Sequence, residues 1–274
     1  MVLVKEPFGA YVSMGGEIMN NIRFVGEGQV YLLASPSRTY ADIAAKVCTS
    51  GLPTPELIGS PENTELVRRV MASGHLAITE FDSWVFLVEG YSRVCEAQLI
   101  RKRHASYMIQ SGRAEKHGKR RHDYVLPDNV YDHYTTVELL TNDMKKVKVS
   151  FTPADIIKII DQWYNEGVEE FGLSEEDLRY LKPQATSWRG LVCMNSHALL
   201  DWFGQRCCMR AQTEIRDMAC KMLAICKREC PAVFAEAGPK CRSLGYCPEG
   251  KLQHEACKMP TKEEVMEVIK NLRK

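Results

Sequence analysis

The sequence predicts an α+β fold with a helical C-terminal half. Two short apolar runs, Val30–Ala34 and Trp84–Val88, have the length and composition of buried strands. From Phe151 onward the pattern of apolar residues changes: they recur at helical spacing and follow helix-capping residues. Strand patterns followed by helix patterns are typical of a domain in which helices pack against a sheet.

Composition and charge narrow the class of protein. The 274 residues suit one or two domains, and 45% apolar with 26% charged residues is the profile of a globular core with a solvated surface. A net charge of only +1 gives the whole chain no electrostatic reason to bind nucleic acid or an anionic membrane. We find neither an apolar run long enough to cross a bilayer nor a secretory leader, and we expect a cytoplasmic protein. The eleven cysteines form no disulfide framework, so most are expected to be reduced, small core residues.

Two helices are expected between the first strand and the second. Ser35 as N-cap and Pro36 at the first helical position predict a helix through Val47. A second helix is expected from Glu62 toward Ala72, ended by Gly74.

The second strand is expected to end near Gly90. A further helix is expected from Ser92, leading into a basic segment that ends near His122. Gly112 and Gly118 favour a loop for that segment.

The C-terminal half carries clearer helix signals. Thr152–Pro153 is an N-cap followed by proline, and Ser174 with Asp177 predicts a short capped helix that ends before Pro183. The first of these helices should present one apolar face, formed by Ile156, Ile159, Ile160 and Trp163.

A long helical region, broken once, is expected over Asn195–Cys230 and ends before Pro231. Its expected core stripe consists of Leu200, Phe203, Cys207 and Ala211. A final charged helix is expected from Thr261.

The basic segment Arg101–Arg113 is the first candidate site. Guanidinium groups stand at both ends, and a Ser111–Gly112 pair precedes the last one. Guanidinium forks and exposed backbone N–H groups bind phosphate, and Gln98 can share a helix face with Arg101 and Lys102. This design suits a small phosphorylated ligand. A solvated basic face, a nuclear-import signal or an RNA-binding patch has the same composition and stays open.

A second basic set, Arg206, Arg210 and Arg216, lies in the long helical region. Arg206 and Arg210 are four residues apart, so on one helix they would face the same side. The alternative is an ordinary helix surface on which Glu214 pairs with Arg210, worth a few tenths of a kcal/mol.

These segments together resemble the flavin-dependent thymidylate synthases. The Arg-x-Arg pattern followed by seven residues and Ser, here Arg101 to Ser111, resembles the signature of that family. The resemblance covers roughly Val30 to Phe234, and four ordered segments are far more specific than one Arg-rich motif. Besides that signature, the matching residues are Gly74, His75, Glu80, Trp84, Phe86, Ser92, Arg93, Gln98, Arg179, Pro183, Asn195, and Arg206 followed by Ala211–Ile215.

The resemblance implies a fold of the thymidylate synthase-complementing-protein type, an antiparallel sheet flanked by helices. It implies a homotetramer with active sites between subunits, FAD reduced by NADPH, and transfer of a methylene group from methylenetetrahydrofolate to C5 of dUMP. A flavin hydride then completes the methyl group, and no enzyme cysteine acts as nucleophile. Residues 1–234 would form the catalytic domain, with 235–274 a Cys-rich loop and terminal helix.

The resemblance also assigns roles residue by residue. Arg206 would be the catalytic residue, lying against the uracil ring, where a fixed cation stabilises developing negative charge. The nucleotide would be held by Gln98, Arg101, Ser111, Gly112, Arg113, Arg179 and Arg206. The cofactor would be held by His75, Ala77, Glu80, Arg101, Lys102, Arg103, Ile109, Asn195, Asp201 and Arg210.

The cofactor side departs from the family pattern at several positions. Lys102 stands where the family usually has His, and Asp201 where it has Asn. Apolar side chains replace an amide, an acid, a tyrosine and a hydroxyl at Met108, Ile109, Ala114 and Ala77. Each lost hydrogen bond removes about 1 kcal/mol of binding. We therefore expect an intact nucleotide site and an altered flavin pocket.

Three functions are compatible with that expectation. The first is a thymidylate synthase with a divergent flavin pocket. The second is a paralog that modifies another pyrimidine nucleotide or uses a different one-carbon donor. The third is a nucleotide-binding protein without catalysis.

The C-terminal tail contains possible zinc ligands, Cys241, Cys247, His254 and Cys257, with Cys230 nearby. Thiolate and imidazole groups could bind zinc tetrahedrally. There is no C-x-x-C pair, however, and the gaps of five, six and two residues match no standard zinc finger. We therefore favour reduced cysteines that pack the tail and expect no metal.

Overall fold

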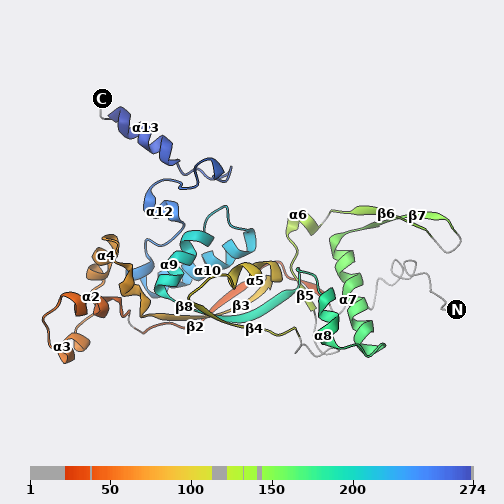
Figure 1. Ribbon diagram of the computed structural model, residues 1–274, viewed down its shortest axis with the longest axis horizontal. Helices are drawn as coiled ribbons and strands as arrows, with labels where there is room; N and C mark the ends of the chain where they lie inside the picture. Colours follow the sequence, from red (N-terminus) through yellow and green to blue (C-terminus); the bar gives the residue numbers. More distant parts are fainter. Residues whose placement is uncertain (1–21, 38, 113–121, 132, 141–143, 273–274) are drawn as a thin grey trace. The chain divides into compact units, whose positions relative to one another are not determined.

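The computed structural model describes residues 22–37, 39–112, 122–131, 133–140 and 144–272. The chain divides into two compact units, each described by itself. Unit 1 comprises residues 1–27, 90–94 and 110–188, and unit 2 comprises residues 28–89, 95–109 and 189–274. Helices and strands are mixed along the chain (Figure 1), which confirms the α+β class.

A four-stranded sheet lies mainly in unit 2, in the order β2 (Gln29–Ala34), β3 (Ser83–Ser92), β8 (Ser187–Asn195) and β4 (Ala105–Ile109). β2 pairs antiparallel with β3, and β4 pairs antiparallel with β8. Side chains alternate between the two faces, so Trp84, Phe86 and Val88 of β3 are buried together. The expected end of β3 at Gly90 is wrong: this glycine has φ 77° and the strand continues to Ser92.

Helices cover the buried face of this sheet (Figure 1). The long helical region is broken once, as predicted, into α9 (Ser196–Arg206) and α10 (Thr213–Glu229), and α11 (Pro231–Phe234) follows. The Phe234 ring packs edge-on against Trp84, with centroids 5.4 Å apart, and against Phe203 at 5.9 Å. These aromatic contacts form the centre of the unit 2 core.

The predicted core stripe of this region is correct only at Phe203. Leu199 and Trp202 are the other large buried side chains of α9. Leu200, Cys207 and Ala211 are only half-buried. Within α9 the buried face is that of Leu199, Trp202 and Phe203, so Leu200 lies beside it. Cys207 and Ala211 come after the end of α9 at Arg206 and leave that face.

Between β2 and β3 the described residues form α2 (Ala41–Thr49), α3 (Thr54–Gly59), α4 (Thr64–Ala72) and the 3-10 turn η2 (Leu76–Glu80). α4 is close to the prediction, with Asn63 as N-cap, whereas α3 was not predicted. The expected start of α2 at Ser35 is wrong, because the helix begins at Ala41. Asp82, distant in sequence, accepts hydrogen bonds from Tyr40 N (2.9 Å) and Thr39 Oγ1 (2.8 Å) and so fixes that start.

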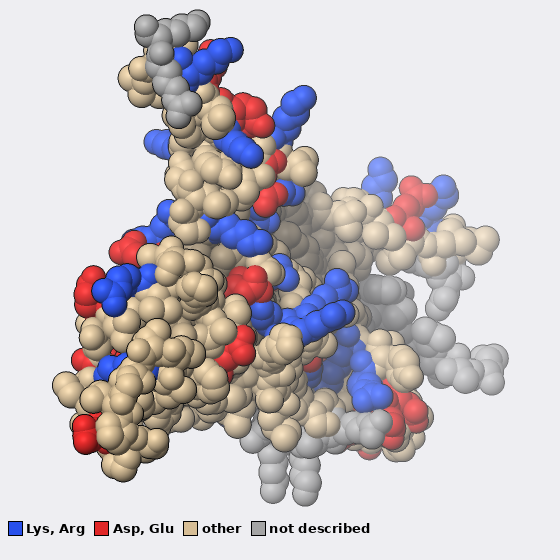
Figure 2. Space-filling model, turned by 60° about the vertical axis from the view of Figure 1, so that its left-hand side comes forward, with Lys and Arg blue, Asp and Glu red and all other residues tan. Residues whose placement is uncertain are grey.

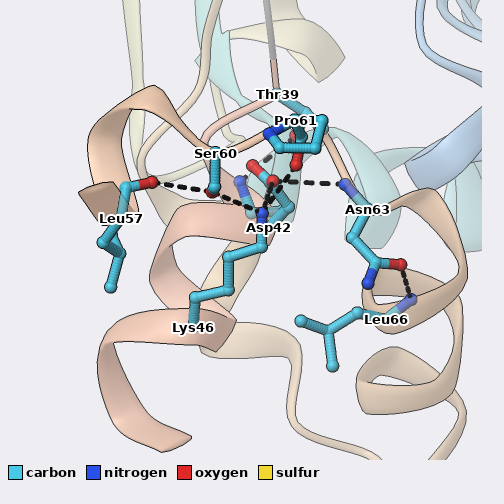
Figure 3. Close-up of polar contacts among 9 residues, drawn as sticks. Thr39, Asp42, Lys46, Leu57, Ser60, Pro61, Asn63 and Leu66 are labelled. Carbon is cyan, nitrogen blue, oxygen red and sulfur yellow. Dashed lines mark hydrogen bonds and ion pairs between the residues drawn. The ribbon is translucent and has the colours of Figure 1, made fainter. Parts of the chain in front are cut away.

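A buried ion pair joins α2, α3 and α4 (Figure 3). The Asp42 side chain is fully buried, and its Oδ2 lies 2.9 Å from Lys46 Nζ and 3.2 Å from Asn63 N. Lys46 also donates to Ser60 Oγ at 2.9 Å and to the Pro61 carbonyl at 2.7 Å. The ammonium group thus replaces its lost water with three acceptors, which a buried charge requires.

Unit 1 contains two small pairs of strands. β1 (Ile22–Phe24) pairs parallel with β5 (His122–Tyr124), and β6 (Thr135–Leu140) forms an antiparallel hairpin with β7 (Lys146–Phe151). The short helix α6 (Asp128–Tyr131) separates the two pairs along the chain. None of these elements was predicted from the sequence.

The main helix of unit 1 is α7 (Pro153–Glu169), with Thr152 as N-cap and Pro153 at the first position, as predicted. Asp155 completes a capping box with Thr152 that was not predicted. The expected apolar face of α7 is wrong as a core face, because Ile156 and Trp163 are 43% and 47% exposed. The helix buries Ala154, Ile157 and Tyr164 instead, together with Asp161. Ser174 caps α8 (Glu175–Leu178), and η3 (Arg179–Leu181) follows before Pro183, as expected.

Asp161 is the centre of a buried polar cluster in unit 1. Its carboxylate pairs with His122 Nδ1 and accepts hydrogen bonds from Tyr124 Oη (2.6 Å) and Asn165 Nδ2 (3.0 Å). Burial by itself would raise the pKa of Asp161, but the hydrogen bond and charge of His122, with the Tyr124 and Asn165 bonds, hold the pKa below its ordinary value. The cluster attaches α7 to β5.

This depressed pKa predicts acid-sensitive stability. The contribution of Asp161 is present above its unfolded pKa of about 3.9 and is lost as pH falls through the folded value. Urea unfolding between pH 3 and pH 7 should therefore show a weaker pH dependence for Asp161→Asn than for the unchanged protein. An equally steep acid loss in the variant would contradict this role for Asp161.

The C-terminal tail contains α12 (Lys240–Leu244), η4 (Gly250–Leu252) and α13 (Lys262–Leu272). The last helix follows Thr261, whose Oγ1 accepts a hydrogen bond from Glu264 N at 3.3 Å, as the sequence predicted. In the part of the chain that the structure describes, no helix has the length and apolarity needed to cross a membrane.

Candidate functional site

The first residues of the basic segment, 101–104, form a tight turn between α5 (Arg93–Leu99) and β4. The expectation of a loop throughout is wrong, because residues 105–109 form a strand paired with β8. The alternation of that strand places Tyr107 inward and Met108, 71% exposed, outward. The run Ala105–Ile109 does not alternate in polarity, because the outward Met108 is apolar, so its sequence did not predict this strand.

Tyr107 closes the turn from inside. Its hydroxyl lies 2.9 Å from the Leu99 carbonyl oxygen and 3.0 Å from that of Lys102, and burial raises the pKa of Tyr107 to about 12. The phenol therefore remains a donor at neutral pH. His104, at φ 56°, takes the left-handed conformation that non-glycine residues rarely adopt. Such backbone persists only where its surroundings enforce it.

The three cations of the turn have different environments. Arg101 and Arg103 are exposed, and neither has a hydrogen-bond or ion-pair partner among the described residues. Lys102 points inward and forms an ion pair with Asp201 of α9. Gln205 Nε2, one helical turn further along α9, lies 2.9 Å from both Asp201 oxygens. Among the described residues, the turn thus has one unpaired guanidinium group on each side of a paired lysine.

Arg206 is the last residue of α9 and is half-buried. Its guanidinium lies 5.6 Å from the centroid of the Trp202 ring, a cation–π contact. Within the described ranges its Nε is buried and has no hydrogen-bond partner. A buried donor without an acceptor is costly, so this atom is suited to meet an acceptor on a ligand.

Arg210 does not share a helical face with Arg206, contrary to expectation, because α9 has already ended. It is exposed and forms an ion pair with Glu249 of the tail. The alternative pairing with Glu214 is wrong as well. Glu214 instead lies 3.3 Å from the amide nitrogen of Gln212, the N-cap of α10.

Comparison with known proteins decides the family. Residues 33–232 match the thymidylate synthase complementing protein family. A flavin-dependent thymidylate synthase of Nitratidesulfovibrio vulgaris is 37% identical over 185 residues, which cover 68% of this chain and 72% of that protein. The chain belongs to the flavin-dependent thymidylate synthase family.

Solved structures agree with the fold. The UMP/dUMP methylase PolB from Streptomyces cacaoi, bound with 5-Br dUMP, aligns with a TM-score of 0.60 at 19% identity, covering 78% of this chain and 95% of that chain. A flavin-dependent thymidylate synthase from Helicobacter pylori, complexed with FAD and dUMP, aligns with a TM-score of 0.57 at 17% identity, covering 77% and 99%. At these identities the likeness confirms the fold class alone.

Two residues that were expected to depart from the pattern of the flavin-dependent thymidylate synthase family are in contact. Lys102 and Asp201, identified separately in the sequence, form one ion pair. Burial would raise the pKa of Asp201, but the hydrogen bond and charge of Lys102 outweigh it and hold the pKa below its ordinary value. Asp201 is therefore ionised at neutral pH, and the two changes offset each other in charge.

The remaining cofactor candidates of this family member also lie in unit 2. His75, Ala77 and Glu80 are exposed, the last two on η2, and Ile109 ends β4 half-buried. Asn195 caps α9 and donates to the Glu80 carbonyl oxygen at 3.2 Å.

Sequence reasoning missed one further member of this group, His197. Its Nδ1 lies 3.0 Å from Glu80 Oε1. No motif marked His197, because the contact depends on the packing of η2 against α9.

The nucleotide candidates are divided between the units. Gln98, Arg101 and Arg206 belong to unit 2, whereas Ser111, Gly112 and Arg179 belong to unit 1. Arg179 is exposed at the start of η3. Arg113, Ala114 and the basic residues Lys119, Arg120 and Arg121 lie outside the described residues.

The buried cysteines are poor nucleophiles. Burial is the largest cause that raises the pKa of Cys95 and Cys226 well above the ordinary value, so both remain thiols at neutral pH. In the described ranges, no group of three or more His, Cys, Asp or Glu side chains is arranged to hold a metal ion. Charges of both signs are scattered over the face of the molecule in Figure 2, in keeping with the small net charge.

Proposed function

We propose that the protein methylates dUMP to dTMP, with FAD as cofactor, methylenetetrahydrofolate as one-carbon donor and NADPH as reductant. The observation that carries the proposal is Arg206, whose buried Nε has no acceptor among the described residues, in the same unit as the free guanidinium groups of Arg101 and Arg103. Family membership supplies the reaction class.

Arg206 would act on the base. A cation fixed beside a uracil carbonyl favours the enolate-like form of the ring and makes C5 more nucleophilic. Its Nε offers the donor that such an oxygen needs. Gln98, Arg101 and the Ser111–Gly112 turn, with Arg113 and Arg179, would hold the nucleotide. The guanidinium groups suit its phosphate in charge and geometry.

The donor set also fits an anionic dinucleotide. Arg101 and Arg103 place two guanidinium groups on one turn, which suits the diphosphate of FAD. Asn195 and the Glu80–His197 pair add hydrogen-bonding groups in the same unit. When bound, the flavin supplies the hydride that completes the methyl group, and the protein's residues bind and orient the reactants.

Self-association is part of the proposal. The face of the sheet opposite the helices carries one apolar residue from each strand: Tyr31, Leu87, Leu191 and Met108. Tyr31 is 45% and Met108 71% exposed. The Glu89–Arg189 ion pair lies on the same face. Exposed apolar side chains beside a charged pair are typical of an interface, and a further copy of the chain would cover them. This supports a homotetramer built from catalytic domains of residues 1–234, with the 235–274 tail appended.

The test is tritium release from 5-labelled dUMP, with UMP and dCMP as controls. A protein that purifies yellow and releases tritium only from dUMP, in the presence of methylenetetrahydrofolate and NADPH, supports the proposal. Faster release from UMP or dCMP would make the protein a modifier of another pyrimidine nucleotide. A colourless protein that FAD cannot reconstitute would identify a nucleotide-binding protein without catalysis.

A further inference from the structure

Contacts on two sides fix the Arg101–His104 turn. The contact on the second side, between Lys102 and Asp201, has no role in the reaction proposed above. Inside, the Tyr107 hydroxyl contacts the carbonyls of Leu99 and Lys102, and Lys102 N donates to the Leu99 carbonyl at 3.0 Å. On the other side, the Lys102 ammonium is paired with Asp201. Backbone and side chain of the middle residue are thus both held.

Asp201 is itself supported. The Gln205 amide lies 2.9 Å from each carboxylate oxygen, which limits the rotation of the side chain. Lys240 adds a second positive charge near this carboxylate. The aspartate side chain is nevertheless 44% exposed, whereas that of Lys102 is only 13% exposed. The ion pair therefore lies at the edge of the interior, with the carboxylate on its solvent side.

This arrangement changes the electrostatic surroundings of the neighbouring arginines. Three consecutive cations repel one another, and the carboxylate neutralises the middle one. With Lys102 drawn toward α9, Arg101 and Arg103 are left exposed on either side of it. The same helix ends at Arg206, five residues after Asp201. One ion pair therefore connects the turn that carries Arg101 and Arg103 to the helix that carries Arg206, all within unit 2.

We propose that Asp201 is a positioning residue, which acts through Lys102 to fix the Arg101 and Arg103 guanidinium groups relative to α9 for binding of a diphosphate-containing cofactor. The inference rests on the proposed function for the identity of that cofactor. Asp201 need not touch the ligand. Its effect depends on Lys102, so the two residues should be energetically coupled.

The test is a double-mutant cycle with Asp201→Asn, Lys102→Met and the double variant. Asp201→Asn should weaken FAD binding and lower kcat/KM for dUMP methylation by about tenfold or more, as expected when binding groups are displaced by a fraction of an ångström. In the Lys102→Met background the same change should alter both quantities less than about twofold. Asp201→Glu, which retains the charge, should recover part of the loss.

The control is Glu138→Gln, which removes an exposed ion pair with Lys146 in the β6–β7 hairpin. It should leave FAD binding and activity unchanged. Thermal melting should show all variants folded, so that a loss of binding is not a loss of structure. Wild-type activity in Asp201→Asn, or equal effects of Asp201→Asn in both backgrounds, would overturn the inference.

Binding of inorganic pyrophosphate, measured by calorimetry, separates this inference from the proposed function. This measurement tests anion binding by the basic turn independently of the methylation reaction. If the unchanged protein binds pyrophosphate and Asp201→Asn weakens that binding, the positioning role stands even where tritium release fails. If the unchanged protein methylates dUMP but Asp201→Asn leaves pyrophosphate and FAD binding intact, the positioning role is wrong and the function stands.

Discussion

Arg206→Gln is expected to lower kcat/KM for dUMP methylation by about 100- to 1000-fold, the range seen when a preorganised group that stabilises developing charge is removed. The variant loses the fixed cation and the buried Nε donor together. Arg206→Lys should recover only part of the loss, because an ammonium group restores the charge but not the planar set of donors. Steady-state kinetics of tritium release measure both effects.

A matched control is available on the next helix. Arg228 of α10 is 68% exposed and pairs with Glu229, so Arg228→Gln should leave the kinetics unchanged. The folded state should survive Arg206→Gln, because a basic residue in the last turn of a helix contributes only about 0.3–1 kcal/mol. Retention of full activity in a folded Arg206→Gln protein would remove Arg206 from the catalytic role.

Asp42→Ala is expected to lower the free energy of unfolding by about 3–5 kcal/mol, as for other buried ion pairs that lose one partner. The change leaves the Lys46 ammonium, whose side chain is 13% exposed, without its carboxylate. It also removes the acceptor of Asn63 N, just before α4 begins. Urea unfolding at neutral pH measures the loss.

The double variant Asp42→Ala/Lys46→Met tests the cause. Removal of the stranded charge should return part of the lost stability, even though the hydrogen bonds of Lys46 to Ser60 and Pro61 are gone as well. A loss below about 1 kcal/mol for Asp42→Ala alone would show that solvent reaches the pair and that α2, α3 and α4 are held together by apolar contacts instead.

Local signals in the sequence were sufficient for several elements. The runs at β2 and β3, helix α4, the Thr152 cap and the break between α9 and α10 depend on residues close together in the chain. Strand β4 was missed because it has only five residues, and β8 because Arg189 and Cys193 on its outer face interrupt its apolar pattern. A strand of this kind is stabilised by its partner, and the partner lies about eighty residues away.

At the candidate site, too, the sequence identified residue types but not the contacts between distant residues. The sequence pointed to Arg101, Lys102, Arg103 and Arg206 as residue types suited to an anionic ligand. It treated Lys102 and Asp201 as two separate departures from the family pattern, because nothing local connects residues 99 positions apart. It also placed Arg206 and Arg210 on one helical face, whereas the helix ends between them and Glu249 of the tail pairs with Arg210.

By itself, the sequence determined the family, the α+β class and the cationic character of the site, since composition, caps and ordered motifs are properties of neighbouring residues. Only the tertiary structure decided where α2 begins, which face of α7 is buried, and that Lys102 is paired while Arg101 and Arg103 have no partner within the described part of the chain. Each of these depends on a partner far away in the chain: Asp82 for α2, His122 for α7 and Asp201 for the turn. The energy of such a contact exists only once folding has brought the two residues together.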